Sequence, residues 1–382
     1  MTSFIQNTDF FAGNNPETIA SEYGTPVYVY NEKILRDRMA KVAKVITKYP
    51  YTANYSVKAN TNIHILKLAL EEGLNCDAMS VGEITLLMKA GFPVERIFFV
   101  PNNVAPYELA FALKNGVMTS LDSLSQLELF GEVCNQMKIE PEKRKCAVRI
   151  NPGVGAGHCE KVVTGGKKTK FGIAEYSIPQ IFEIAEKYQI TIAGINQHIG
   201  SLFMDPQPYL DAVTNLLRIA HQFKNLEFID FGGGYGIPYH KLDEEKDFPM
   251  EDFKTRLEPI LDEFVASYGK APLFKSEPGR FCVAEGSVIL GRVHATKENS
   301  GIQFAGSDIG MNVLVRPSMY DSHHDIEVFR DGEIVSRDNL IEQTVTGNIC
   351  ESGDILAKNR LLPKIEEGDL LCVLDTGAYG WS

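Results

Sequence analysis

Short β-prone runs alternate with helical runs through the middle of the chain, and this alternation constrains the fold more than any other feature. About eight β-then-α steps lie between Tyr51 and Gly279. The strand candidates begin at Thr52, Cys76, Ile97, Val117, Cys146, Ile192, Phe228 and Leu273. Alternating β and α segments are typical of a parallel sheet, and eight units in about 250 residues match the size of a closed (β/α)8 barrel.

An open doubly wound sheet is the alternative to the barrel. Such a sheet would be expected to carry a glycine-rich fingerprint after its first strand. Here the first strand candidate is followed by Lys58-Ala59-Asn60, so we prefer the barrel.

The pattern changes after Arg280, where short strand-like runs separated by turns predict an antiparallel β domain. An early strand-like run, Thr25 to Asn31, can pair into that domain and leave the barrel as an insertion in the linear order. We therefore expect three regions. They are an N-terminal segment over 1–35 that gives a strand to the β domain, a barrel over 36–280 and a β domain over 281–382.

Charge and cysteine content restrict the class of protein. Lys and Arg number 38 against 50 Asp and Glu, which gives a net charge of −12 and argues against binding to nucleic acid or to an anionic membrane. No apolar run approaches the ~20 residues of a membrane helix, and the N-terminus does not resemble a secretory signal. The seven cysteines are odd in number and lack CxxC spacing, so we expect no metal site and a cytoplasmic location. Cys350 precedes Glu351 in a polar loop, where a chemical role and an exposed bystander are about equally expected.

Active sites of such barrels lie at the carboxyl ends of the strands. The side chains predicted there are Lys58, Asp77, Glu83, Arg149, His198, Ser201, Glu277 and Arg280, together with the glycine run Gly232–Gly236. A lone lysine after a strand is usually solvated, but in a dry barrel mouth the pKa of Lys58 would fall and the amine would suit a Schiff-base nucleophile. Glycine runs are often simple turns. After the seventh strand of a barrel, however, such a run is the usual phosphate site, and Arg280 would lie near it.

Two further side chains indicate which phosphate compound would bind. Glu277 can cap a turn, or it can pair with a pyridine nitrogen and keep that nitrogen protonated. His198 can be an ordinary core histidine, or its ring can stack on a flat cofactor. A lysine, a phosphate loop and a carboxylate for a ring nitrogen together describe pyridoxal 5′-phosphate.

At these residues the sequence resembles the fold type III (alanine-racemase-fold) decarboxylases that depend on pyridoxal phosphate, from about Gly24 to the last residue. The segments that carry the resemblance in the barrel are Tyr55–Asn60, Asp77 with Glu83, Arg149, Thr164–Gly172, His198–Ser201, Gly232–Gly236 and Glu277–Arg280. The resemblance implies that Lys58 holds the cofactor and that Asp77 and Arg149 lie near it. It also implies that His198 stacks on the ring, that Glu277 meets its nitrogen, and that the phosphate is bound by Ser201, Gly233, Gly234, Gly279 and Arg280.

The resemblance extends into the β domain. Arg316 and Tyr320 are similar to the family residues that hold a substrate carboxylate together with Arg280, and Tyr379 to one near the phosphate and substrate. The run beginning Cys350-Glu351 resembles a loop that reaches the active site of the other subunit. There the cysteine acts in proton transfer and the glutamate meets the distal amino group of the substrate. This implies a homodimer with shared active sites, acting on meso-2,6-diaminopimelate to give L-lysine and CO2, the last step of lysine biosynthesis.

The sequence departs from the family at three places. Gln197 stands where many relatives have a second histidine, and Val100–Val104 differs from the usual loop after the third strand. Relatives continue beyond the position of Ser382, so the resemblance predicts a β domain that is truncated at its C-terminal end. Two alternatives stay open. One is a decarboxylase of D-ornithine, D-lysine or a carrier-bound amino acid, and the other is a catalytically silent relative that binds the cofactor.

Overall fold

The structure is a computed structural model that describes residues 3–153, 166 and 169–381. Cys159, and Thr164 at the start of the Thr164–Gly172 segment, lie outside the described residues. The chain divides into two compact units. The barrel unit comprises Arg36–Gly236 and Phe248–Cys282, and the β unit comprises Met1–Leu35, Ile237–Asp247 and Val283–Ser382.

The barrel unit holds a closed parallel sheet. Its strands are β2 (Tyr51–Ser56), β3 (Asn75–Ala78), β4 (Ile97–Phe99), β5 (Met118–Leu121), β6 (Lys145–Asn151), β8 (Thr191–Asn196), β9 (Phe228–Asp230) and β10 (Leu273–Ser276). The ring closes because β10 pairs with β2 and β5 pairs with β6. A short ninth strand, β7 (Ile173–Ala174), adds to β6. All eight predicted strands form, and the predicted barrel is confirmed.

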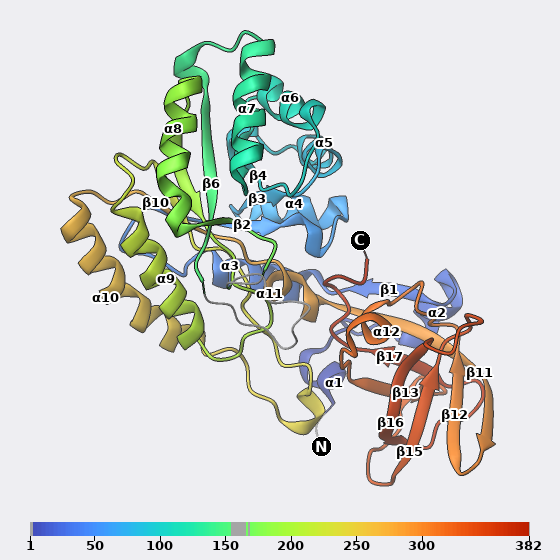
Figure 1. Cartoon of the computed structure of the whole chain (residues 1–382). Helices are drawn as coiled ribbons and strands as arrows, with labels where there is room; N and C mark the ends of the chain where they lie inside the picture. Colours follow the sequence, from blue (N-terminus) through green and yellow to red (C-terminus); the bar gives the residue numbers. More distant parts are fainter. Residues whose placement is uncertain (1–2, 154–165, 167–168, 382) are drawn as a thin grey trace. The chain divides into compact units, whose positions relative to one another are not determined.

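Helices follow the strands as the alternation predicts. They are α4 (Ile63–Glu71), α5 (Val81–Ala90), α6 (Pro106–Asn115), α7 (Leu124–Gln136), α8 (Ile178–Tyr188), α9 (Gln207–Ala220), α10 (Met250–Tyr268) and α11 (Arg280–Val283), while α3 (Glu32–Val42) precedes the first barrel strand. Figure 1 shows α7 and α8 beside β6. The hydroxyl of Ser123 accepts the Gln126 N–H and is the N-cap of α7.

The β unit holds an eight-stranded sheet in the described part of the chain. Its strands are β1 (Val27–Tyr30), β11 (Ser287–Asn299), β12 (Ile302–Ser307), β13 (Ile326–Arg330), β14 (Glu333–Ile334), β15 (Leu340–Thr346), β16 (Ile355–Pro363) and β17 (Leu370–Val373). The early strand β1 pairs antiparallel with β11, as the sequence predicts. The expectation of an antiparallel domain needs one correction, because β12 and β15 pair in parallel. Three short helices complete this unit: α1 (Phe4–Thr8), α2 (Pro16–Tyr23) and α12 (Arg316–Tyr320).

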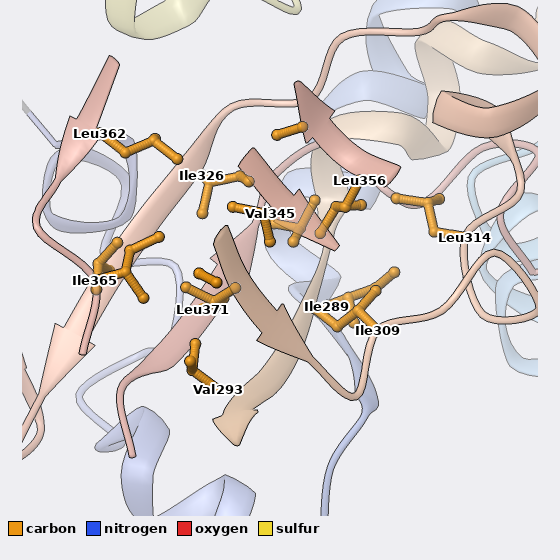
Figure 2. Close-up of a cluster of buried hydrophobic side chains, with 14 residues drawn as sticks. Ile289, Val293, Ile309, Leu314, Ile326, Val345, Leu356, Leu362, Ile365 and Leu371 are labelled. Atoms are coloured by element: carbon orange, nitrogen blue, oxygen red, sulfur yellow. The ribbon is translucent and has the colours of Figure 1, made fainter. Parts of the chain in front are cut away.

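A core of aliphatic side chains supports the β unit. Figure 2 shows Ile289, Val293, Ile326, Val345 and Leu371 in this cluster, and each is at most 1% exposed. Burial of each such side chain stabilises the unit by about 1.5–3 kcal/mol relative to leaving it in water. The core therefore gives the β unit a hydrophobic centre of its own.

One segment of the chain lies in a different unit from its sequence neighbours. Ile237–Asp247 connects β9 to α10 of the barrel, yet it packs within the β unit. The Leu242 N–H donates to the Asp325 carboxylate, and the Lys241 ammonium lies 2.8 Å from Asp375 and 3.1 Å from Glu285. The sequence-based division had included this segment in the range 36–280.

No described helix is both long and apolar enough to cross a membrane. Among the described residues there is also no group of His, Cys, Asp and Glu side chains that could hold a metal ion.

Candidate active site

Four of the predicted site residues lie at strand ends in the barrel mouth. Lys58 follows β2 in a short 3-10 helix, Val57–Ala59, and Asp77 lies in β3. His198 lies two residues after β8, and Glu277 follows β10 directly. The positive charge of Lys58 acts on the pKa of each of the other three side chains. The barrel thus brings these four residues together, as the sequence predicts.

Asp77 is fully buried, and its position follows from the sheet register. Ser56 and Asp77 are paired residues of β2 and β3, and the Ser56 hydroxyl donates to Asp77 Oδ1 over 2.7 Å. Burial raises the pKa of Asp77, while Lys58 and the Ser56 hydroxyl oppose that rise. Its other oxygen, Oδ2, has no hydrogen-bond partner among the described residues.

Glu277 is 3% exposed, and its Oε1 atom is buried without a hydrogen-bond partner in the described chain. Burial, followed by the nearby carboxyls of Asp230 and Asp77, raises the pKa of Glu277 well above its usual range. The positive charges of Lys58 and Arg149 oppose that rise, so burial favours the neutral carboxyl and a further cation at Oε1 would favour the ionised one. A protonated pyridine nitrogen is a cation with one N–H to donate, so this orphaned acceptor fits pyridoxal phosphate.

His198 has a defined ring orientation. The Gly233 N–H donates to His198 Nδ1 over 3.2 Å. Burial, followed by the charges of Lys58 and Arg149, lowers the pKa of His198 well below its usual range. The imidazole is therefore neutral, and because Nδ1 accepts, its proton is on Nε2.

The glycine run Gly232–Gly236 passes close to neighbouring backbone on two sides. Gly232 and Gly234 have φ values of +75° and +117°, which side-chain-bearing residues rarely adopt. A Cβ at Gly232 would collide with the Gln197 carbonyl, and one at Gly233 would collide with the Glu277 carbonyl. Glycine is required here because the run lies between the strand ends that carry His198 and Glu277.

Arg280 and Ser201 are joined beside this run. The Arg280 guanidinium donates to Ser201 Oγ through Nε at 3.3 Å and Nη2 at 3.1 Å. Arg280 is 5% exposed and begins α11, directly after Gly279. A buried guanidinium and a hydroxyl in contact are groups that bind phosphate oxygens.

Arg149 in β6 is also buried, and its guanidinium lies 4.6 Å from the centre of the Phe171 ring. Burial lowers its pKa, and the carboxyls of Glu277 and Asp122 oppose that shift. Asp122 accepts a hydrogen bond from Asn102. Glu83 lies in the first turn of α5, whose N-cap is Ser80, and its carboxylate accepts the Met79 N–H over 2.6 Å.

Asp230 is a buried residue that sequence reasoning missed. Its Oδ1 accepts the Gly232 N–H over 2.9 Å, and its Oδ2 accepts from Asn54 at 3.3 Å. Burial raises its pKa to about 7. The pattern Asp-Phe-Gly carried a usable signal, since aspartate often accepts from the N–H two residues on.

The β unit carries five further predicted residues. Arg316 begins α12 and is 2% exposed. Its guanidinium contacts His324 Nε2 at 2.7 Å and lies 4.7 Å from the centre of the Tyr239 ring. Tyr320 ends the same helix, and Tyr379 has a positive φ of 57°.

Cys350 and Glu351 are exposed at the loop between β15 and β16. Hydrogen bonds to the buried side chain of Asp354 hold the backbone of that loop in place. Its buried carboxylate accepts the Met311 N–H at 2.6 Å and the Ile349 N–H at 2.7 Å. The thiol and carboxylate are thus presented to solvent on an ordered turn.

Comparison with known proteins places this chain in a family. Residues 32–284 match the family of pyridoxal-dependent decarboxylases over its pyridoxal binding domain. Diaminopimelate decarboxylase of Methanothermobacter thermautotrophicus is 40% identical, over 97% of this chain and 86% of the relative. That of Archaeoglobus fulgidus is 34% identical, over 95% and 85%. The crystal structure of diaminopimelate decarboxylase from Helicobacter pylori complexed with L-lysine has a TM-score of 0.86 at 28% identity, covering 96% of this chain and 89% of that chain.

The chain belongs to the pyridoxal-dependent decarboxylases, which are pyridoxal phosphate-dependent lyases. Within that class, the relatives compared here are diaminopimelate decarboxylases. The predicted family, its cofactor and its alanine-racemase-like combination of barrel and β domain are confirmed.

Proposed function

We propose that this protein decarboxylates meso-2,6-diaminopimelate to L-lysine and CO2, and that the barrel mouth holds its cofactor. The observation that carries the proposal is the buried Glu277, whose orphaned Oε1 lies in the same mouth as Lys58. The names of the relatives support the substrate.

The cofactor-binding roles are assigned to residues already described in the barrel. Pyridoxal phosphate, when bound, supplies an electron sink for the electron pair left by departing CO2. Lys58 would hold the cofactor through Nζ, and Asp77 and Arg149 would lie near it. Ser201, Gly233, Gly234, Gly279 and Arg280, with Tyr379 of the β unit, would bind its phosphate.

Glu277 and His198 would set the electronic state and orientation of the ring. Glu277 would accept the N–H of the ring nitrogen at Oε1 and would ionise as it does so. The low dielectric of the buried site makes this charge pair strong. His198 is neutral and is held at Nδ1 by Gly233, so its ring is pre-oriented to stack.

The substrate would be held mainly by arginines. Arg316 and Arg280 would bind carboxylates, with Tyr320 and Tyr379 beside them, because a guanidinium binds a carboxylate through two parallel hydrogen bonds. Glu351 would bind the distal ammonium. Cys350 would return a proton from Sγ to the carbon that has lost CO2.

The exposure of Cys350 and Glu351 supports a shared site in a homodimer. If Cys350 serves the partner's site, then mixing inactive Lys58→Ala and Cys350→Ser proteins restores activity. One intact site forms in each mixed dimer, so about a quarter of the parent activity is expected. Activity no higher than that of either variant alone would contradict the shared site.

The cytoplasmic location stays a prediction.

The test of function is product analysis with meso-diaminopimelate and pyridoxal phosphate. Equal amounts of CO2 and L-lysine are the expected result. D-ornithine and D-lysine serve as matched substrates that keep a distal amine but lack the second carboxylate. Turnover of either in preference to diaminopimelate would contradict the proposed substrate, and no turnover of any of the three would favour a silent relative.

A further inference from the structure

We propose that Tyr209 is a positioning residue for the glycine run, because its hydroxyl holds the Gly232 carbonyl and so fixes the loop that receives the cofactor phosphate. The Tyr209 hydroxyl is itself hydrogen-bonded to Tyr235, and the hydroxyls of Ser276 and Tyr51 lie further along the same group of contacts. The inference rests on the proposed function, in which the glycine run binds that phosphate.

Two of the hydroxyls, those of Tyr235 and Tyr209, donate one after the other toward the glycine run. Tyr209 lies in α9, and its hydroxyl donates to the Gly232 carbonyl over 2.9 Å. The Tyr235 hydroxyl donates in turn to the Tyr209 oxygen over 3.2 Å. The Ser276 hydroxyl also hydrogen-bonds to Tyr235, and it lies 2.6 Å from the Tyr51 hydroxyl, where either group can be the donor. Successive hydroxyls of this kind polarise one another and strengthen the last bond, which here is the one to the loop.

Each phenol in the chain keeps its proton at neutral pH. Tyr209 is 1% exposed and Tyr235 is 2% exposed. Burial raises the pKa of Tyr209 well above its usual range, and it raises the pKa of Tyr235 to about 12. Both side chains are therefore hydrogen-bond donors across the working range of an enzyme.

The bond from Tyr209 acts on a peptide unit with two functional ends. The Gly232 carbonyl belongs to the same planar peptide as the Gly233 N–H, and that N–H donates to His198 Nδ1. The Glu277 N–H also donates to the Gly232 carbonyl, over 2.9 Å. Tyr209 thus binds the carbonyl of a peptide in the phosphate loop. The N–H of the same peptide contacts the stacking histidine, and its carbonyl also contacts the backbone of Glu277.

Removal of the hydroxyl alone leaves the packing in place. The Tyr209 ring packs against Tyr235 at 5.3 Å and against Phe253 and Phe203 at 5.4 Å between ring centres. Phenylalanine keeps those ring contacts. The chain also offers a matched control, because the Tyr268 hydroxyl donates to the Phe223 carbonyl over the same distance, 2.9 Å.

The experiment compares Tyr209→Phe, Tyr235→Phe and the control Tyr268→Phe as apoproteins. We would measure dissociation constants for pyridoxal 5′-phosphate and for pyridoxal, which lacks the phosphate. We expect Tyr209→Phe to weaken binding of the phosphate form about fivefold relative to pyridoxal, the size of one neutral hydrogen bond. Tyr235→Phe should show a smaller effect in the same direction, and Tyr268→Phe should show none.

Amide hydrogen exchange of residues 232–236 in the same apoproteins gives a readout that needs no cofactor. Faster exchange in Tyr209→Phe, together with the selective loss for the phosphate form, supports the inference. Faster exchange without that selective loss overturns it, and so does behaviour like that of Tyr268→Phe in both measurements. If the parent protein itself binds both compounds equally, the phosphate assignment of the glycine run fails, and the inference falls with it. If Tyr209→Phe does not fold, Tyr235→Phe decides by the same criteria.

Discussion

The barrel mouth and the Cys350 loop present functional groups in opposite ways. In the mouth, Asp77, Glu277 and Arg280 are at most 5% exposed. All three lie at strand ends, and side-chain hydrogen bonds with Ser56 and Ser201 hold Asp77 and Arg280. In the loop, Cys350 and Glu351 are exposed, and only Asp354 beneath them is buried. This difference matches the two roles proposed above. The buried charged region would bind the cofactor, and the exposed thiol would act in a site that it shares with the partner subunit.

The largest expected effect lies in the mouth. Lys58→Ala should lower kcat by about 10⁴-fold, because no other described group replaces its amine as nucleophile and proton carrier. Steady-state release of CO2 measures it. The matched control is Lys67→Ala, which removes an exposed lysine of α4 and should leave kcat unchanged. A Lys58→Ala protein that matches the parent in every measured property, with neither protein releasing CO2, would instead support the silent alternative.

Glu277→Gln should change activity and stability in opposite directions, lowering kcat and raising the Tm of the apoprotein. We expect kcat to fall by about 10²–10³-fold, because an amide does not stabilise a ring cation as a carboxylate does. The pKa of Glu277 is raised in the folded apoprotein. Its carboxyl therefore contributes fully to folding stability only below the pKa that it has in the unfolded chain. That contribution to the free energy of unfolding is lost as the pH rises toward the pKa in the folded state. The apoprotein of the variant should therefore melt at a higher Tm than the parent near pH 8.

The Tm difference should shrink toward pH 4, where the carboxyl is protonated in both the folded and the unfolded state. Calorimetry of the two apoproteins at the two pH values measures it. A variant that melts below the parent at pH 8 would show that Glu277 is ionised and already paired.

Cys350→Ser tests the exposed region. Activity should fall by about 10²-fold, since serine is a much weaker acid than the thiol, while Tm should stay within measurement error because the side chain is exposed. Ser352→Ala in the same loop is the control and should change neither quantity. A large loss of Tm in Cys350→Ser would contradict the contrast between the two regions.

Asp354→Asn should have the smallest effect. Met311 and Ile349 donate to different oxygens of Asp354, and an amide replaces one of these oxygens with an NH2 group. One of the two bonds is therefore lost and the other loses its charge, so we expect the loop to loosen and kcat to fall severalfold. Amide exchange at residues 347–353 should quicken at the same time. Unchanged exchange would show that Asp354 does not organise the loop.

Sequence reasoning located most of the strand framework. The eight barrel strands were visible because each is a short apolar run followed by a helix, and the strand ends led directly to Lys58, Asp77, His198 and Glu277. Strand β16 was not foreseen, because Lys358, Asn359 and Arg360 interrupt its apolar pattern and Asn359 has a positive φ of 48°. The parallel pairing of β12 with β15 was missed because strand direction depends on the long connection between them.

The sequence by itself determined the fold class and the family, and it supplied the residues proposed to carry the chemistry, since these depend on local periodicity and on motifs at strand ends. Only the tertiary structure decided the raised pKa of Glu277 and the lowered pKa of His198, the placement of Ile237–Asp247 in the β unit and the hydroxyl contacts beside the glycine run. These features arise between residues far apart in the chain. Tyr51 meets Ser276, 225 positions away, and burial by distant segments sets each pKa. No local pattern specifies which distant polar groups will meet in a dry interior.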